Sequence, residues 1–328
     1  MKRATGWAVL SGVLLASVLV RLSMGRSLEG GMLFGFPPDA MPWRVGAVQS
    51  AAAAGAALAL AGLLLQGMLR NPLASPFVLG MSGGSQAAVS LTVLAAWRWG
   101  AAPGAGAQLL AGTVGGVAAL LLCALFGRTR QRGLDPVTLV LAGVVVAAMA
   151  GSVTSLCEWL LPAGERGGLM AWGFGRIPET PDGLVWGALA VTLACTLTWT
   201  LWNAGTLDAL QLGEDEAASV GVNLRAARWS IVLLSGALTA CATALCGPLA
   251  FVGLVAPHLA RGLLGASHRR SAWGTVLAGA ALLVAADAVR SLLPVQGGRL
   301  PVGVVCALAG GPAFLWMLRR GVTEAWRA

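Results

Sequence analysis

Few side chains in this chain of 328 residues have a type and spacing that could carry out catalysis. Lys2 is the only lysine, so the chain cannot contain the phosphate-binding loop GxxxxGK followed by Ser or Thr, which needs a lysine to reach the phosphates. His258 and His268 are the only histidines, and they show neither HExxH nor cluster spacing. The sequence therefore predicts neither an ATPase nor a metallohydrolase, and we expect the chain not to be an enzyme.

Metal ligands are equally scarce. The six cysteines lie in apolar stretches without CxxC spacing, which is typical of small packing residues rather than of a metal site or a disulfide framework. The sequence shows no cluster of His, Cys and carboxylate residues that could bind a bare metal ion. We expect no metal and no cofactor in this chain. The cysteines are Cys123, Cys157, Cys195, Cys241, Cys246 and Cys306.

Asp287 and Arg290 are the main ionisable residues inside a long apolar stretch, and Arg21 and Glu158 lie near the ends of two others. Ion-coupled transporters usually place such groups within the membrane as proton or ion relays. Asp287 and Arg290 are three residues apart, however, and would share one face of a helix. The spacing favours a local ion pair over a proton relay.

One acidic segment, Gln211 to Val222 (QLGEDEAASVGV), stands between two apolar runs. Gly213 precedes three acidic residues, which the helix dipole favours in a first turn, and Gly221 follows as a residue that commonly ends a helix. The pattern predicts a short helix that could fit a groove on a partner protein. The alternative is a solvated loop.

The elements that carry these residues must be membrane helices. The chain is 57% hydrophobic and 11% charged, with a mean hydropathy of +0.78, whereas a soluble domain is about 25% charged. Roughly 20 apolar residues cross the ~30 Å core of a bilayer, and we predict one all-α domain over residues 1–328 with about ten spans and the acidic segment 211–222 outside the membrane. The predicted spans are 7–24, 45–69, 77–97, 107–126, 136–160, 184–203, 228–246, 249–264, 273–293 and 302–318.

The distribution of the 22 Lys and Arg residues predicts the orientation, because cytoplasmic loops retain basic residues. Most of these residues fall on the inner side when both termini and the acidic segment are cytoplasmic. The net charge of +9 then reflects topology and lipid head groups, and we expect no nucleic-acid partner. The first 25 residues are better explained as an anchored helix than as a cleaved signal peptide.

Four segments in series resemble the signature of the permeases of iron-siderophore, haem and cobalamin ABC importers, the FecCD family of type II importers. The resemblance runs from about Arg44 to Arg320 in matching order and spacing. It includes the acidic segment described above. The segments are QGMLRNPLASPFVLG at 66–80, LGEDEAASVGV at 212–222, GPLAFVGLVAPHLAR at 247–261 and LPVGVVCALAGGPAFLWML at 300–318.

The resemblance implies the type II permease fold, with ten helices per subunit and two permease copies, expected to form a homodimer, around a central path. It also implies two separate ATPase subunits, which bind ATP and Mg, and a periplasmic binding protein. The chain would sit in a bacterial inner membrane as a multi-pass protein. It would import an iron(III)-siderophore or a similar chelate, such as haem or cobalamin, by alternating access.

The resemblance further assigns roles to residues. Asn71, Leu73, Pro136 and Val137 would form a cytoplasmic gate, although physical reasoning alone makes Asn71-Pro72 only a helix stop. The path would be lined by apolar faces of the fifth and tenth spans. The segment that couples the permease to its ATPase would comprise Gly213, Glu214, Asp215, Glu216, Ala217, Ser219 and Gly221.

Two departures from the family pattern concern the binding-protein side. Arg44 matches the first position of an RxPR pair, but Gly46 and Ala47 stand where Pro and the second Arg are expected, and Arg299 stands where many members have Glu. Arg44 and Arg299 are the candidates for docking the binding protein, and anchoring at the membrane interface is the alternative.

Two other functions remain open from the sequence. An ion-coupled secondary transporter or channel would act without an ATPase, and a structural scaffold would move nothing. Neighbouring genes for an ATPase and a secreted binding protein would favour the importer over both.

Overall fold

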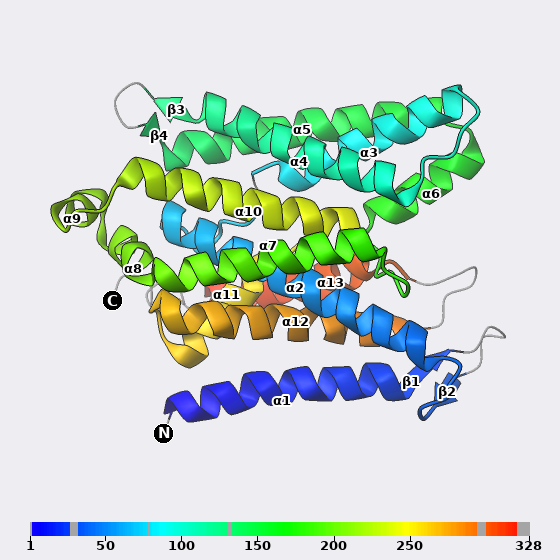
Figure 1. Ribbon diagram of the computed structural model, residues 1–328, viewed down its shortest axis with the longest axis horizontal. Coiled ribbons are helices and arrows are strands. Elements are labelled where there is room, and N and C mark those ends of the chain that lie inside the picture. The colour runs from blue at the N-terminus through cyan, green and yellow to red at the C-terminus, as the bar shows by residue number, and fades with distance from the viewer. Residues whose placement is uncertain (1, 27–31, 78, 130–132, 294–299, 320–328) are drawn as a thin grey trace.

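The computed structural model describes residues 2–26, 32–77, 79–129, 133–293 and 300–319. These residues form a bundle of roughly aligned helices with two small β-hairpins at its ends (Figure 1). The elements are α1 (Lys2–Ser23), β1 (Met24–Arg26), β2 (Met32–Phe34), α2 (Met41–Leu69), α3 (Met81–Arg98), α4 (Ala105–Phe126), β3 (Arg128–Thr129), β4 (Gly133–Leu134), α5 (Pro136–Leu160), α6 (Ala163–Gly173), α7 (Gly183–Trp202), α8 (Ala204–Leu212), α9 (Glu214–Ser219), α10 (Leu224–Cys246), α11 (Val252–Leu264), α12 (His268–Leu292) and α13 (Val302–Arg319).

The helical fold agrees with the prediction, and each predicted span overlaps one helix. Seven helices in the described part of the chain are long and apolar enough to cross a membrane, so the count of ten stays a prediction. The predicted spans 77–97 and 249–264 are wrong at their starts, because α3 begins only at Met81 and α11 only at Val252. The 13 residues of α11 extend about 20 Å at 1.5 Å per residue, less than the ~30 Å of a bilayer core.

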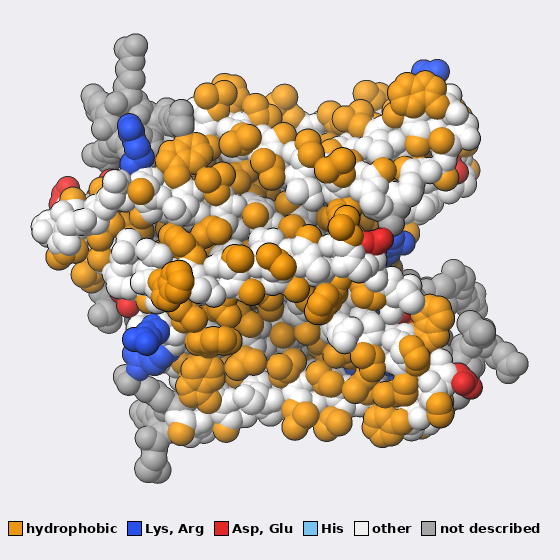
Figure 2. Space-filling model, in the orientation of Figure 1, with side chains coloured by type: hydrophobic (Ala, Val, Ile, Leu, Met, Phe, Trp, Pro, Cys, Tyr) orange, Lys and Arg blue, Asp and Glu red, His pale blue; other side chains and the backbone are white. Residues whose placement is uncertain are grey.

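Apolar side chains cover the middle of the visible face, whereas charged side chains gather toward the ends of the helices (Figure 2). Large apolar residues such as Leu19, Leu121 and Val191 are exposed along the helices. A surface of this kind suits lipid and not water, and the chain is a multi-pass membrane protein. We call the end that carries α8 and α9 the α9 end. The opposite end carries the hairpin of β1 and β2, and we call it the hairpin end, although the smaller hairpin of β3 and β4 lies at the α9 end (Figure 1).

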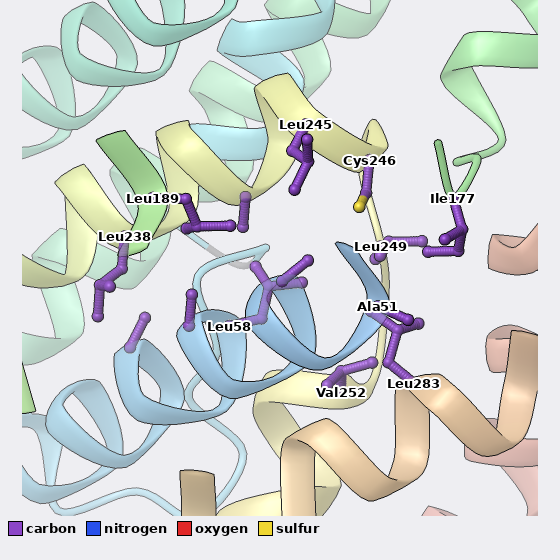
Figure 3. Packing of buried hydrophobic residues seen from close by; sticks show 14 of the residues in the cluster. Ala51, Leu58, Ile177, Leu189, Leu238, Leu245, Cys246, Leu249, Val252 and Leu283 are labelled. Carbon is purple, nitrogen blue, oxygen red and sulfur yellow. The ribbon is translucent and has the colours of Figure 1, made fainter. Parts of the chain in front are cut away.

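Helix α2 lies at the centre of the bundle. In its most apolar stretch 83% of the residues are buried within the chain, against 17% in α1, which packs mainly on α12. The main core joins α2 to its neighbours: Figure 3 shows Leu58 of α2 among Leu189 of α7, Leu238 of α10 and Leu283 of α12. The position of α2 therefore depends on close contact with several helices at once.

Glycines allow the backbone of α2 to contact the backbones of α11 and α12 directly. A methyl group placed on Gly62 would lie 1.8 Å from the carbonyl oxygen of Gly253 in α11, and one on Gly55 would lie 2.2 Å from the carbonyl oxygen of Gly279 in α12. Small residues permit such approaches between membrane helices, where close packing must replace the hydrophobic effect. Helices α2, α11 and α12 thus form a tightly fitted group.

Replacing Gly62 with alanine is expected to destabilise the protein by about 1–3 kcal/mol or more, because the new methyl group meets backbone that cannot rotate away. The measurement is the midpoint of thermal unfolding of the purified protein in detergent. Gly12→Ala in α1 is the matched control, since a methyl group there meets nothing within 4 Å. Equal midpoints for the two variants would contradict the close approach of α2 and α11.

Candidate functional site

The α9 end carries the acidic segment, and a glycine separates its two short helices. Gly213 lies between α8 and α9 with φ 153° and ψ 165°, a conformation that is essentially restricted to glycine. A methyl group on Gly213 would also lie 1.8 Å from the Oε2 atom of Glu216. The chain can make the sharp bend between α8 and α9 only with glycine at this position.

The helix predicted between Gly213 and Gly221 is present as α9; its last residue is Ser219, and Gly221 follows as the expected terminating residue. Gly221 has φ 84°, and its N–H donates to the carbonyl of Ala218 while the N–H of Val222 donates to that of Ala217, both at 3.0 Å. This pair of hydrogen bonds is the Schellman ending of a helix. Ala217 is fully buried and packs near Val222, so α9 rests on the core by one side chain.

The three acidic residues of α9 have different environments. Glu214 forms an ion pair with Arg228 of α10, whereas Asp215 and Glu216 are exposed. The hydroxyl of Ser219 donates within the helix to the carbonyl of Glu216 at 2.8 Å. One carboxylate therefore fixes α9 to α10, and two remain at the surface.

Two exposed apolar residues flank these carboxylates. Leu212 is 74% exposed and Val220 is 70% exposed. Together with Asp215 and Glu216 they form what we call the α9 surface, at the tip of the molecule where acidic side chains are visible in Figure 2. A short, projecting helix with apolar and acidic side chains can fit a groove on a partner protein.

The predicted helix stop at Asn71-Pro72 is confirmed. Helix α2 ends at Leu69 with Arg70 in a left-handed conformation (φ 46°), and the Oδ1 atom of Asn71 accepts a hydrogen bond from the N–H of Leu73 at 2.9 Å. An Asn side chain that bonds two residues ahead stabilises a turn. Leu73 is left 40% exposed.

The other predicted gate residues begin α5. Asp135 caps this helix, with its Oδ2 atom accepting from the N–H and the hydroxyl of Thr138 at 2.9 and 2.7 Å. Pro136 occupies the first turn, where its missing N–H costs nothing, and Val137 is 68% exposed. Both gate segments lie toward the α9 end (Figure 1), and their role as a gate stays a prediction.

Gln66 and Arg261 link the end of α2 to α11. Gln66 is fully buried; its amide donates to the carbonyl of Leu254 at 3.2 Å and accepts from the Nη1 atom of Arg261 at 3.1 Å. Both residues stand in the motifs quoted above, but sequence reasoning gave them no role. Their polarity within apolar stretches was the signal available.

Asp208 and His268 link α8 to α12 and were also missed. The Oδ1 atom of Asp208 accepts from the backbone N–H of His268 at 2.8 Å and lies 2.7 Å from its Nδ1 atom, while Ser267 donates to Oδ2 at 3.3 Å. Burial raises the pKa of the Asp208 carboxyl, but the hydrogen bonds from His268 and Ser267 outweigh it and hold that pKa below its usual value. The carboxylate therefore stays ionised and joined to α12.

The predicted ion pair in α12 forms, and it has a further partner at the hairpin end. Asp287 is fully buried, with Oδ1 2.5 Å from Nη2 of Arg290 and Oδ2 2.6 Å from Nε of Arg21 in α1. Arg21 also lies 3.4 Å from Glu179 in the loop before α7. The sequence could not show that α1 supplies the second arginine, because the two residues are 266 positions apart.

Arg44 has an internal role in the structure. It is 4% exposed, and its Nη1 atom donates to the carbonyls of Leu22 and Gly35 at 2.6 and 2.8 Å. These bonds join the start of α2 to the end of α1 and to the loop after β2. The geometry does not support direct contact between Arg44 and a binding protein; Arg299 lies outside the described residues.

Known proteins resemble this chain over nearly its whole length. The sequence profile of the FecCD transport family matches residues 39–320. The hemin transport permease HmuU of Yersinia pestis is 32% identical over 319 residues, covering 92% of this chain and 93% of its own. The vitamin B12 import permease BtuC of Vibrio vulnificus is 37% identical over 269 residues, covering 81% of this chain and 78% of its own.

The fold is also similar to that of a solved inward-facing structure of a metal-chelate type ABC transporter. The TM-score is 0.82 at 26% sequence identity, and the match covers 97% of this chain and 99% of the other.

Proposed function

This chain belongs to the FecCD transport family, and on that premise we propose that it is the membrane permease of an ATP-driven importer of metal chelates. Two copies would enclose a central path, with a periplasmic binding protein on one side and two ATPase subunits, which bind ATP and Mg, on the other. The α9 end and both termini would face the cytoplasm. Arg299 is kept as a candidate contact for the binding protein.

The observation that carries this proposal is the α9 surface. It projects from the bundle between two positions where glycine fixes the backbone, Gly213 and Gly221, and the ion pair from Glu214 to Arg228 fastens it to α10. A rigid projection of this kind can transmit the closure of an ATPase as a rigid-body displacement. Asp215 and Glu216 would meet the ATPase, whereas Glu214 would serve inside the permease.

The cargo class follows from the relatives and from the proposed path. HmuU and BtuC are named for hemin and for vitamin B12, two bulky compounds whose metal is already enclosed. Helix α5 exposes Leu141, Val144 and Met149, and such apolar side chains would interact weakly with a wrapped metal. We propose an iron(III)-siderophore, haem or cobalamin as the cargo.

An ion-coupled transporter is the second candidate, and the environment of Asp287 weighs against it. Both carboxylate oxygens of Asp287 face arginine nitrogens within an ion pair. A proton or cation relay needs a carboxylate that can load and release its ion. A carboxylate held between two buried arginines is better suited to holding helices together.

The test is reconstitution of the permease in liposomes with its cognate ATPase and binding protein. We expect uptake of haem, ferric siderophore or cobalamin to require ATP on the ATPase side and loaded binding protein on the other. Radiolabelled cargo trapped in the vesicles gives the measurement. Uptake that proceeds without the ATPase and follows an imposed ion gradient would refute the proposal in favour of the second candidate.

A further inference from the structure

A partly buried polar cluster joins the segment before α9 to two other helices. It consists of Asp208 and Gln211 in α8, Ser267 and His268 at the start of α12, and the backbone of Gly67 in the last turns of α2. His268 is fully buried. Helix α8 is thus held from the side opposite to the ion pair that joins Glu214 to α10.

Hydrogen-bond geometry gives the orientation of the His268 ring. The ionised carboxylate of Asp208 can only accept, so the Nδ1 atom 2.7 Å away carries a hydrogen. In the neutral ring the Nε2 atom is then an acceptor. Asp208 therefore fixes both the tautomer and the direction of the ring, and the ring directs its Nε2 atom toward α2.

Gly67 makes room for this arrangement. A methyl group on Gly67 would lie 2.9 Å from Nε2 of His268 and 4.0 Å from Nε2 of Gln211. Among the described residues neither of these buried nitrogen atoms has a hydrogen-bond partner, and one is an acceptor while the other is a donor. The two side chains, from α12 and α8, therefore both lie over the backbone of α2 at Gly67.

The connections of α8 to α12 and of α9 to α10 matter because the chain bends at Gly213, between α8 and α9. A six-residue helix attached through such a bend could swing without moving the bundle. The ion pair from Glu214 to Arg228 connects α9 to α10 only. The hydrogen bonds of Asp208 connect α8 directly to α12, which is itself in backbone contact with α2 at Gly55 and Gly279.

We propose that Asp208 is a positioning residue of the transport cycle, which through His268 makes α8 move together with α12 and α2 when α9 is displaced. This inference rests on the proposed function. Asp208 does not touch the cargo or the ATPase; it converts movement of a surface segment into movement of the central helices.

The test is Asp208→Ala in the complete importer, reconstituted with ATPase and binding protein. The measured quantity is the amount of chelate imported per ATP hydrolysed. We expect a decrease of roughly tenfold, within the range of coupling between distant sites, while the affinity of the ATPase for the permease stays within about twofold of wild type. Asp208→Asn should recover part of the loss, because the amide oxygen can still accept both hydrogen bonds.

Asn203→Ala is the matched control. Asn203 caps α8 at its other end, and its amide nitrogen donates to Trp199 within the preceding helix at 2.9 Å, so its removal leaves the connection to α12 intact. The ratio for this variant should equal that of wild type.

Substitutions of His268 test the same connection if Asp208→Ala fails to fold. The amide nitrogen of Asn can replace the Nδ1 donor, whereas that of Gln occupies the position of Nε2, where it cannot donate to Asp208. We expect His268→Asn to retain more import per ATP than His268→Gln.

Three results would overturn the inference: an unchanged ratio in Asp208→Ala, a fall in ATPase affinity that accounts for the whole loss, or equal ratios for the two His268 variants. A wild-type permease that imports nothing would instead refute the proposed function.

Discussion

Replacing Asp287 with alanine is expected to destabilise the protein by about 3–5 kcal/mol, the usual cost of removing one partner from a buried ion pair. Asp287 is fully buried, and its loss leaves Arg290 without its carboxylate and Arg21 with only the more distant Glu179. Two buried guanidinium groups then lack most of their compensation. In thermal unfolding of the detergent-solubilised protein we expect the midpoint to fall by roughly 4–7 °C.

Asp182→Ala is the control for the loss of a carboxylate near the same end of the molecule. Asp182 is exposed and caps α7 by accepting from the N–H groups of Leu184 and Val185, so its loss should cost only about 0.5–2 kcal/mol. Asp287→Asn keeps the shape of the side chain and should be less harmful than alanine. If Asp287→Ala destabilises the protein no more than Asp182→Ala does, the buried ion pairs of Asp287 do not stabilise the fold as described.

Gly221→Pro and Glu216→Arg are expected to abolish the coupling between ATP hydrolysis and uptake. Proline requires φ near −65°, whereas Gly221 has φ 84° and donates its N–H to Ala218, so the end of α9 cannot form. Glu216→Arg instead reverses a charge on the α9 surface. Uptake in proteoliposomes should fall by roughly tenfold or more, and the thermal midpoint should change little because α9 buries only Ala217.

The matched controls are milder substitutions at the same two positions, Gly221 and Glu216. Gly221→Asn retains the N–H and tolerates the left-handed conformation, and Glu216→Gln removes the charge without reversing it. Both should transport better than their disruptive counterparts. Unchanged uptake and unchanged ATPase association in Gly221→Pro and Glu216→Arg would remove α9 from the coupling role.

Features that depend on local pattern could be predicted from the sequence. The apolar runs gave helices at each expected place, Gly221 ends α9, and Asn71-Pro72 stops α2. The spacing of Asp287 and Arg290 was sufficient to predict their ion pair. Each of these outcomes is decided within a few residues along the chain.

Features that depend on contacts between distant segments could not be predicted. The apolar sequence of α1 does not reveal that Arg21 meets Asp287, and nothing beside Asp208 indicates His268 as its partner. The late start of α11 was missed for a related reason: Gly247 to Phe251 is as apolar as a helix, but Phe251 has φ 67°. Hydropathy reports the solvent of a residue and not its backbone conformation.

The ion pair between α1 and α12 also constrains the order in which the protein can be completed during synthesis. Arg21 is made 266 residues before Asp287, and at about 5–20 residues per second it waits for roughly 15 to 50 seconds. During that time the long side chain of Arg21 must reach toward the membrane surface to keep its charge hydrated. The ion pair that joins α1 to α12 can therefore form only after α12 has been made.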